Sequence, residues 1–157
     1  LGWSISQKNR EDGFAAIQKL TGIKGRFHWL SNHPALILDV SHNEAGLKEL
    51  WSQINQLKFA HLHVILGFVK DKDVKKALML CPKEATYYFT QAHIPRALAS
   101  TELGKMAHSI GLKGEVMEHV TMALDHAFAV AKPEDLILVT GSFFILEEAY
   151  QYKHQKN

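Results

Sequence analysis

The sequence has little cysteine and little proline, and it lacks any long hydrophobic run. One Cys and four Pro occur in 157 residues. A disulfide needs two cysteines, so none can form within the chain, and we expect Cys81 to be a small core residue in a reducing compartment. No apolar run approaches the roughly 20 residues of a membrane-spanning helix, and nothing at the start resembles a signal peptide. We therefore expect a cytoplasmic protein with no membrane contact.

The chain also lacks an excess of charge of either sign. Lys and Arg number 18 against 16 Asp and Glu, which gives a net charge of +2, and no basic run stands out. A nucleic-acid partner is therefore not expected, although a small basic pocket remains possible. The hydrophobic content of 46% suffices for the core of one domain of ordinary size.

Recognisable catalytic and metal motifs are missing too. Ten histidines are present, but no pair has a third ligand at metal-binding spacing; His61 and His63 point the same way on an expected strand, with no cysteine or carboxylate beside them. The chain has no P-loop, GxGxxG, CxxC or GxSxG motif. Ser142 has no following glycine at elbow spacing, so nucleophilic catalysis is not expected. We predict no metal ligands and no self-contained catalytic residues.

Two glycines divide the chain near its start. Residues 4–20 carry apolar side chains at roughly helical spacing, and residues 21–25, TGIKG, then break that pattern. The first residue is Leu rather than Met. We therefore expect residues 1–24 to be a tail or linker helix from an amino-terminal domain that this chain does not contain, and residues 25–157 to be the compact domain.

Strand-like and helix-like segments alternate after residue 25. Expected strands lie at 27–30, 35–40, 61–68, 86–90, 115–118 and 136–140, and helical spacing follows most of them. Such alternation predicts an α/β, Rossmann-like three-layer domain with a mostly parallel sheet of about six strands. Only the first strand should be antiparallel, because residues 31–34, SNHP, favour a hairpin turn.

Polar residues gather at the expected strand-to-helix turns. In a parallel sheet these turns all lie at the carboxyl ends of the strands, and this is the edge of the sheet at which open α/β folds bind ligands. The residues are Asp39, His42 and Asn43; Lys70 to Asp73; Gln91, His93 and Arg96; His119; and Thr140, Gly141 and Ser142. Arginine suits bidentate recognition of a carboxylate and lysine a point contact with phosphate, so the set predicts an anion-binding crevice.

Each of these residues also has a purely structural interpretation. Ser41 or Asn43 could cap the following helix, and Asp39 could be a strand-end acceptor. Asp73 and Ser142 are equally suited to capping, and one hydroxyl can both cap a helix and contact a ligand. Arg96 has no obvious packing role beside Pro95. The residue types alone leave these alternatives open.

Five segments in order resemble a known family. They are Gly25-Arg26, ILDVSHN at 37–43, GFVKDKD at 67–73, TQAHIPRAL at 90–98 and LVTGSFF at 138–144. Together, from about Gly25 to about Glu148, they resemble the C-terminal domain of the Mur ligase superfamily. Within it, they are most similar to the bifunctional folylpolyglutamate synthase/dihydrofolate synthase family.

The resemblance implies an ATP-dependent ligase in which L-glutamate attacks the acyl phosphate of dihydropteroate or folate. It implies that Arg26 and Asp39 hold the nucleotide ribose and phosphates, with His42 and Asn43 at the ATP and glutamate end of the cleft. Lys72, Arg96 and Ser142 match positions associated with the carboxylates of the incoming amino acid. The P-loop lysine, the Mg ligands and the folate pocket are expected in the protein's own N-terminal P-loop domain, so this chain alone should not turn over.

Several residues depart from the family pattern. Ile23-Lys24 replace Trp-Pro before Gly25-Arg26, Val40-Ser41 replace Gly-Ala, Glu44 replaces Pro, and Ile94 replaces Asn. Glu44 and Ile94 favour a rival interpretation, a non-catalytic α/β interaction or regulatory domain that kept the fold and lost the ligand. A third possibility is a ligase of the peptidoglycan branch, and the turn from Gln91 to Arg96, where the amino acid is selected, should discriminate it.

Overall fold

The computed structural model describes residues 25–70 and 73–155. The helix expected over residues 4–20 and the expected site residue Lys72 lie outside the described residues. The proposed boundary between a linker and a compact domain therefore stays a prediction.

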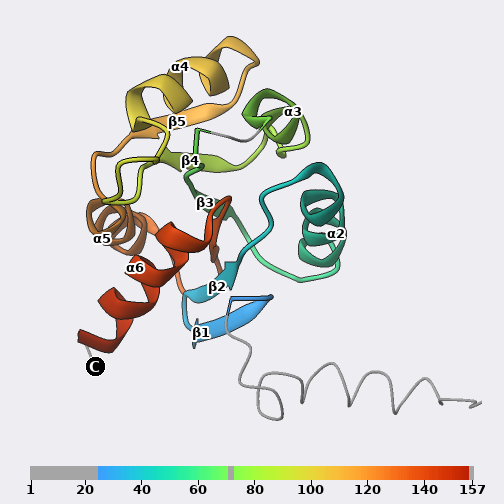
Figure 1. Cartoon of the computed structure of the whole chain (residues 1–157). Helices are drawn as coiled ribbons and strands as arrows, with labels where there is room; N and C mark the ends of the chain where they lie inside the picture. The colour runs from blue at the N-terminus through green and yellow to red at the C-terminus, as the bar shows by residue number, and fades with distance from the viewer. Residues whose placement is uncertain (1–24, 71–72, 156–157) are drawn as a thin grey trace, which may run out of the picture.

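The described chain is a six-stranded sheet with helices on both faces (Figure 1). The strands are β1 (His28–Asn32), β2 (Ala35–Asp39), β3 (Leu62–Leu66), β4 (Thr86–Phe89), β5 (Lys113–Val116) and β6 (Leu136–Thr140). The helices are α2 (Glu44–Ile54), α3 (Val74–Met79), α4 (Ser100–Ser109), α5 (Val120–Val130) and α6 (Phe143–Gln155). The spatial strand order is β1-β2-β6-β3-β4-β5. Only β1 pairs antiparallel, with β2, and the other four pairings of named strands are parallel, which confirms the predicted fold class.

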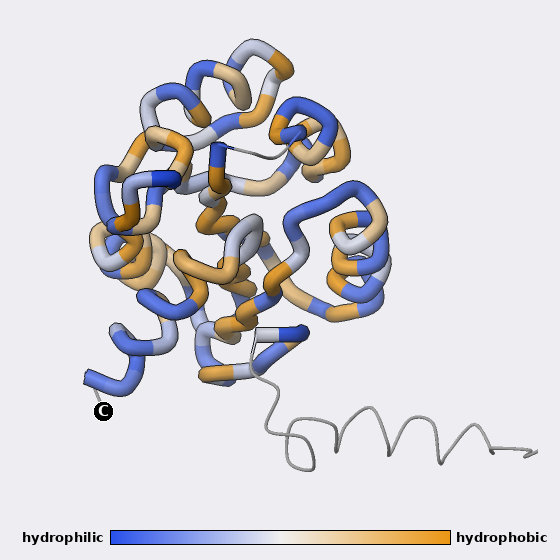
Figure 2. The backbone as a smooth tube through the Cα atoms, in the orientation of Figure 1, coloured by the Kyte–Doolittle hydropathy of each residue, from blue (hydrophilic) through white to orange (hydrophobic). Residues whose placement is uncertain are grey.

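Two hydrophobic layers bury the sheet. Along β3, Val64 and Leu66 face the layer built with α2, α3 and α4, whereas Ile65 faces the layer built with α5 and α6. Figure 1 shows α2 and α3 on one side of the sheet and α5 and α6 on the other. Because both faces are covered, the central strands β3 and β6 are buried along their whole length and mostly hydrophobic rather than alternating (Figure 2).

The expected bounds of most strands were wrong by one or two residues; the first strand ends at Asn32 rather than at residue 30, and the third is Leu62–Leu66 rather than 61–68. The first strand begins at His28 rather than at residue 27, because Phe27 has a φ of 46°, outside the extended region. The fifth strand spans Lys113–Val116 instead of 115–118. Gly114 pairs with Tyr87 so closely that a Cβ there would collide with the Tyr87 backbone. A glycine inside a strand often marks such a close approach, and the expected range missed it.

The helix ends and the single cysteine agree with expectation. Gly111 follows the last turn of α4 with a φ of 87°, the left-handed conformation that a C′ glycine supplies. Cys81 is buried in the core, and this burial raises the pKa of its thiol to about 12. Among the described residues, no helix combines the length and the apolar character needed to cross a bilayer.

Candidate functional site

The carboxyl ends of the parallel strands lie in register. Asp39 of β2 pairs with Thr140 of β6, Thr140 pairs with Leu66 of β3, and Leu66 pairs with Phe89 of β4. The turns that follow these strands are therefore neighbours, although they lie far apart in the sequence. The structure brings together the Asp39, Arg96 and Ser142 turns at one edge of the sheet, as the sequence predicted.

Asp39 ties the start of the domain to this edge. Its Oδ2 accepts a hydrogen bond from Phe27 N at 2.9 Å and its Oδ1 accepts one from Ser41 N at 2.8 Å, and the residue is only 8% exposed. Val40 N also donates to Gly25 O at 2.7 Å. Asp39 is thus a strand-end acceptor, one of the roles left open by the sequence. Arg26 is exposed, and its neighbours Gly25 and Phe27 are hydrogen-bonded to Val40 and Asp39. These bonds place Arg26 beside the end of β2.

His42 and Asn43 fix the start of α2. Asn43 Oδ1 accepts from Gly46 N at 2.8 Å, which confirms the capping interpretation. His42 Nδ1 lies 2.8 Å from Val40 O. Because a carbonyl oxygen can only accept, Nδ1 carries the proton and Nε2 is left as the acceptor of the neutral ring. Glu44 pairs with Lys48 at 2.6 Å, so its added negative charge is partly offset within α2.

The turn after β6 is packed tightly against the turn after β3. Gly141 has a φ of 109°, and a Cβ there would lie 2.5 Å from Gly67 O, so only glycine fits. Ser142 is 5% exposed, and its Oγ accepts from Phe144 N at 3.1 Å. The Ser142 hydroxyl therefore caps α6, and its proton remains available for a further acceptor.

The loop after β4 carries Arg96 at the surface. Arg96 O accepts from Lys70 N at 3.0 Å, and Leu98 N donates to Phe68 O at 2.9 Å, so this loop pairs with the loop after β3. The Arg96 guanidinium carbon lies 5.1 Å from the centroid of the Phe144 ring. Asp73 caps α3 through Lys76 N and pairs with Lys76 at 2.8 Å, which confirms its structural role.

Two contacts at this edge were missed by sequence reasoning. Phe144 lies against Arg96, and Glu148 Oε1 accepts from His93 N at 2.7 Å across 55 residues of sequence. Both residues belong to α6, where Phe144 looks like an ordinary apolar position and Glu148 like a solvated charge. No local pattern signals a contact with a loop so far away in the chain.

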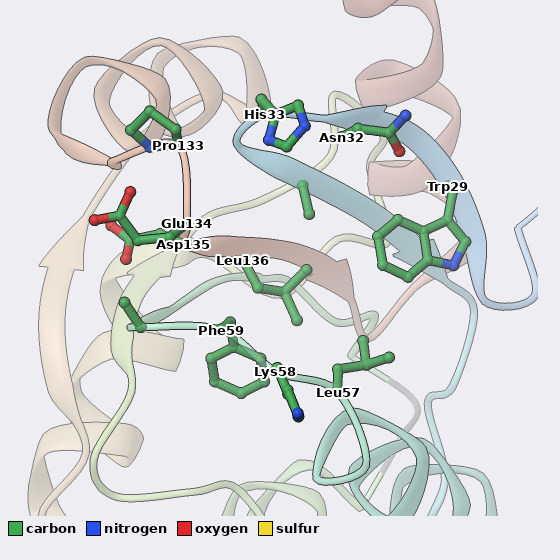
Figure 3. A pocket seen from close by; sticks show the side chains of 12 residues that line it. Trp29, Asn32, His33, Leu57, Lys58, Phe59, Pro133, Glu134, Asp135 and Leu136 are labelled. Atoms are coloured by element: carbon green, nitrogen blue, oxygen red, sulfur yellow. The ribbon is translucent and has the colours of Figure 1, made fainter.

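The opposite edge of the sheet, at the amino ends of the parallel strands, holds an open pocket of about 590 Å³. Its walls come from the β1–β2 hairpin, from residues 57–60 and from residues 133–136. Figure 3 shows Leu136 between the side chains of Trp29 and Phe59. None of the predicted site residues lines this pocket. The pocket and the predicted site residues therefore lie at opposite edges of the sheet.

A buried histidine and aspartate lie beside that pocket. His63 Nδ1 is 3.1 Å from Tyr88 Oη, and His63 Nε2 is 3.5 Å from Asp135 Oδ2. The expectation that no carboxylate lies beside this histidine was wrong, because Asp135 reaches it from just before the neighbouring strand β6. Burial and the nearby His61 lower the pKa of His63, against the opposing effect of Asp135. Burial alone would raise the pKa of Asp135, but hydrogen bonds from Lys132 N and from His63 outweigh it and lower that pKa. Within the described part of the chain, no cluster of three or more His, Cys, Asp or Glu residues could hold a metal ion.

Comparison with known proteins identifies relatives along nearly the whole chain. A family model described as Mur ligase, glutamate ligase domain, matches residues 25–143. The dihydrofolate synthase/folylpolyglutamate synthase of Escherichia coli is 31% identical over 144 residues, which cover 90% of this chain and 32% of that protein. A Bacillus cereus UDP-N-acetylmuramoyl-L-alanyl-D-glutamate–2,6-diaminopimelate ligase is 27% identical over 144 residues, covering 87% of this chain and 29% of that ligase.

Solved structures give the same result. The structure of E. coli FolC in complex with DHPP and ADP superposes with a TM-score of 0.80 at 26% identity, over 99% of this chain and 36% of that one. The chain thus spans about a third of the length of these relatives. The family match covers most of the chain, and the observed sheet agrees with that likeness. This chain therefore belongs to the family of Mur ligase glutamate ligase domains.

Proposed function

We propose that this chain is the C-terminal domain of an ATP-dependent carboxylate–amine ligase that adds L-glutamate to dihydropteroate or folate. The observation that carries the proposal is the convergence of the Arg26, Arg96 and Ser142 turns at one sheet edge. A cationic and hydroxyl-bearing edge suits phosphates and a dicarboxylate amine. The likeness to the E. coli folate ligase supports the choice of substrates.

Arg26, Asp39, His42 and Asn43 form the proposed nucleotide side of the edge. Arg26 is exposed, and both of its neighbours are anchored to the end of β2. Each oxygen of Asp39 accepts one backbone hydrogen bond, which leaves each with capacity for one more donor, such as a ribose hydroxyl. The likeness to E. coli FolC, which was solved with ADP, supports ATP as the nucleotide.

Arg96 and Ser142 form the proposed glutamate side, together with Lys72. The guanidinium of Arg96 offers a fork of donors for one carboxylate, and Ser142 Oγ can donate its proton to another acceptor. Lys72 stays a prediction because it lies outside the described residues. Three polar groups of this kind would bind two carboxylates and orient the amine for attack.

The remaining parts of the reaction are assigned outside this chain. Activation transfers the γ-phosphoryl group of ATP to the substrate carboxylate, and the glutamate amine then displaces phosphate to form the amide. The described residues offer no cluster for a divalent metal, so no Mg ligand is assigned among them. We propose that Mg, the phosphate-binding loop and the folate pocket belong to an N-terminal P-loop domain that works with this one.

A peptidoglycan ligase is the second candidate, because the B. cereus diaminopimelate ligase is also similar along most of the chain. The two candidates differ in the acceptor and in the amino acid. Assaying phosphate release in a two-domain ligase containing this chain separates them. Dihydropteroate or folate with L-glutamate should support turnover, whereas a UDP-muramoyl peptide with diaminopimelate should not. The reverse preference would replace the folate assignment with the cell-wall one.

The isolated 157-residue chain tests more sharply whether the catalytic parts lie in the other domain. Phosphoryl transfer depends on positioning and on metal-borne charge that we assign to the other domain. We expect no ADP formation from ATP, folate and L-glutamate with this chain alone. Turnover by the isolated chain would contradict the domain assignment. A two-domain ligase inactive with every carboxylate tested would instead favour a non-catalytic domain.

A further inference from the structure

Arg96 has one prominent side-chain contact, with the ring of Phe144. The distance of 5.1 Å from the guanidinium carbon to the ring centroid is within the range of a cation–π interaction. Arg96 is exposed and Phe144 is half-buried. No ion pair to Arg96 is present among the described residues. The ring therefore contacts this cation without neutralising its charge.

The contact is part of a two-point attachment between α6 and the loop after β4. Phe144 and Glu148 are four residues apart on the helix, so they lie on the same face. Glu148 accepts a hydrogen bond from His93 N, near the start of the loop, and Phe144 contacts Arg96 near its end. At its other side, Phe144 N donates to Ser142 Oγ. One helix face thus links Ser142 to Arg96 through Phe144.

This attachment would help Arg96 to bind a carboxylate. A free arginine has several rotatable bonds, and fixing them upon binding costs conformational entropy. A ring against the guanidinium restricts those rotations in advance. The aromatic ring engages the guanidinium as a cation, whereas the carboxylate needs its N–H donors. Phe144 can therefore orient Arg96 without competing for the hydrogen bonds that recognise a carboxylate.

We propose that Phe144 is a positioning residue that holds Arg96 for a carboxylate of the incoming amino acid, with Glu148 anchoring the same loop. This inference rests on the proposed function, because it takes Arg96 as a glutamate contact. It adds a specific cause of affinity that lies in α6 and not in the loop itself. Removing the ring should weaken carboxylate binding without removing the charge.

The test is an NMR titration of the 157-residue chain with L-glutamate, followed at the Arg96 side chain. Phe144→Leu should weaken L-glutamate binding about threefold to tenfold, the range expected for loss of one cation–π contact. It should also abolish the ring-current shift of the Arg96 side-chain protons. Phe144→Tyr keeps an aromatic face and should retain both properties. Arg96→Lys should bind more weakly still, because it loses the planar fork.

A matched control exists on the other side of α6. Lys153 Nζ lies 5.5 Å from the centroid of the Phe128 ring, a cation–π contact of the same type between α5 and α6. Phe128→Leu should lower the melting temperature about as much as Phe144→Leu does, but it should leave L-glutamate binding unchanged. The control separates a lost local contact from general loosening of the helix pair.

The outcomes distinguish the inference from the function on which it rests. A wild-type chain whose Arg96 signals do not respond to L-glutamate would overturn the glutamate assignment of Arg96, and the inference with it. A responding wild type for which Phe144→Leu titrates identically would overturn the inference alone. Equal weakening in Phe144→Leu and Phe128→Leu would also overturn it, because the effect would then be structural.

Discussion

Two buried carboxylates, at opposite edges of the sheet, invite comparison. Asp39 is the last residue of β2, and Asp135 immediately precedes β6, the strand that pairs with β2. They are 8% and 5% exposed; Asp39 accepts two backbone hydrogen bonds and Asp135 accepts one. Both are therefore buried acceptors of backbone hydrogen bonds, and burial alone does not distinguish them.

Their surroundings differ in chemistry. Asp39 lies at an edge that also carries Arg26, His42 and Arg96, whereas Asp135 lies against the buried ring of His63. The Asp135 edge has the larger hollow, but it lacks arginine among its lining residues. A buried carboxylate next to a strand terminus can therefore have a purely structural role. A functional claim must rest on the charged groups that lie around the carboxylate.

The largest expected effect is on stability at the Asp135 edge. Asp135→Ala removes the acceptor for Lys132 N, at the surface, and the partner of the buried His63. We expect the free energy of unfolding to fall by about 1–3 kcal/mol, because the buried His63 is left without its partner and such a loss costs about that much. Urea denaturation measures this. Glu134→Ala, an exposed neighbour, is the control and should change stability by less than about 0.5 kcal/mol.

A smaller effect is expected for the two helix caps at the Asp39 edge. Asn43→Ala should lose about 1 kcal/mol through its cap to Gly46 N, and Asp73→Ala less, because its bond to Lys76 N is longer at 3.4 Å. If Asn43 also lies at the nucleotide, only Asn43→Ala should weaken ATP binding in the two-domain ligase. Equal ATP affinity in both variants would leave Asn43 as a cap alone.

The smallest effect concerns pH at the Asp135 edge. The pKa of His63 is lowered in the folded state, so the unfolded chain binds this proton more readily. Stability from His63 is then fully present above the unfolded pKa of about 6.5 and is lost as pH falls below it. His63→Gln should flatten the dependence of melting temperature on pH between about 7.5 and 5. An unchanged slope would mean that other histidines cause any loss.

The sequence predicted the fold well, because the alternation of strands and helices and the hairpin turn are local patterns. It also placed Asp39, Arg96 and Ser142 at one edge, since parallel strands put all such turns there. It could not decide whether Asp39, Asn43 and Ser142 only accept hydrogen bonds within the fold or also contact a ligand, because one residue type serves both roles. It missed Phe144 and Glu148, whose contacts join α6 to a loop about 50 residues earlier. Long-range packing of this kind leaves no periodic signal.

The variant Asp39→Ala tests whether the Asp39 edge binds the nucleotide. Loss of a charged acceptor whose hydrogen bonds are worth about 1.5–3 kcal/mol should weaken ATP binding by roughly tenfold to a hundredfold. ATP titration and melting temperature should be measured on the same two-domain ligase, with Asp135→Ala as the matched control. We expect both variants to melt at lower temperature and only Asp39→Ala to lose ATP affinity. An unchanged dissociation constant for Asp39→Ala, beside a lowered melting temperature, would contradict this expectation.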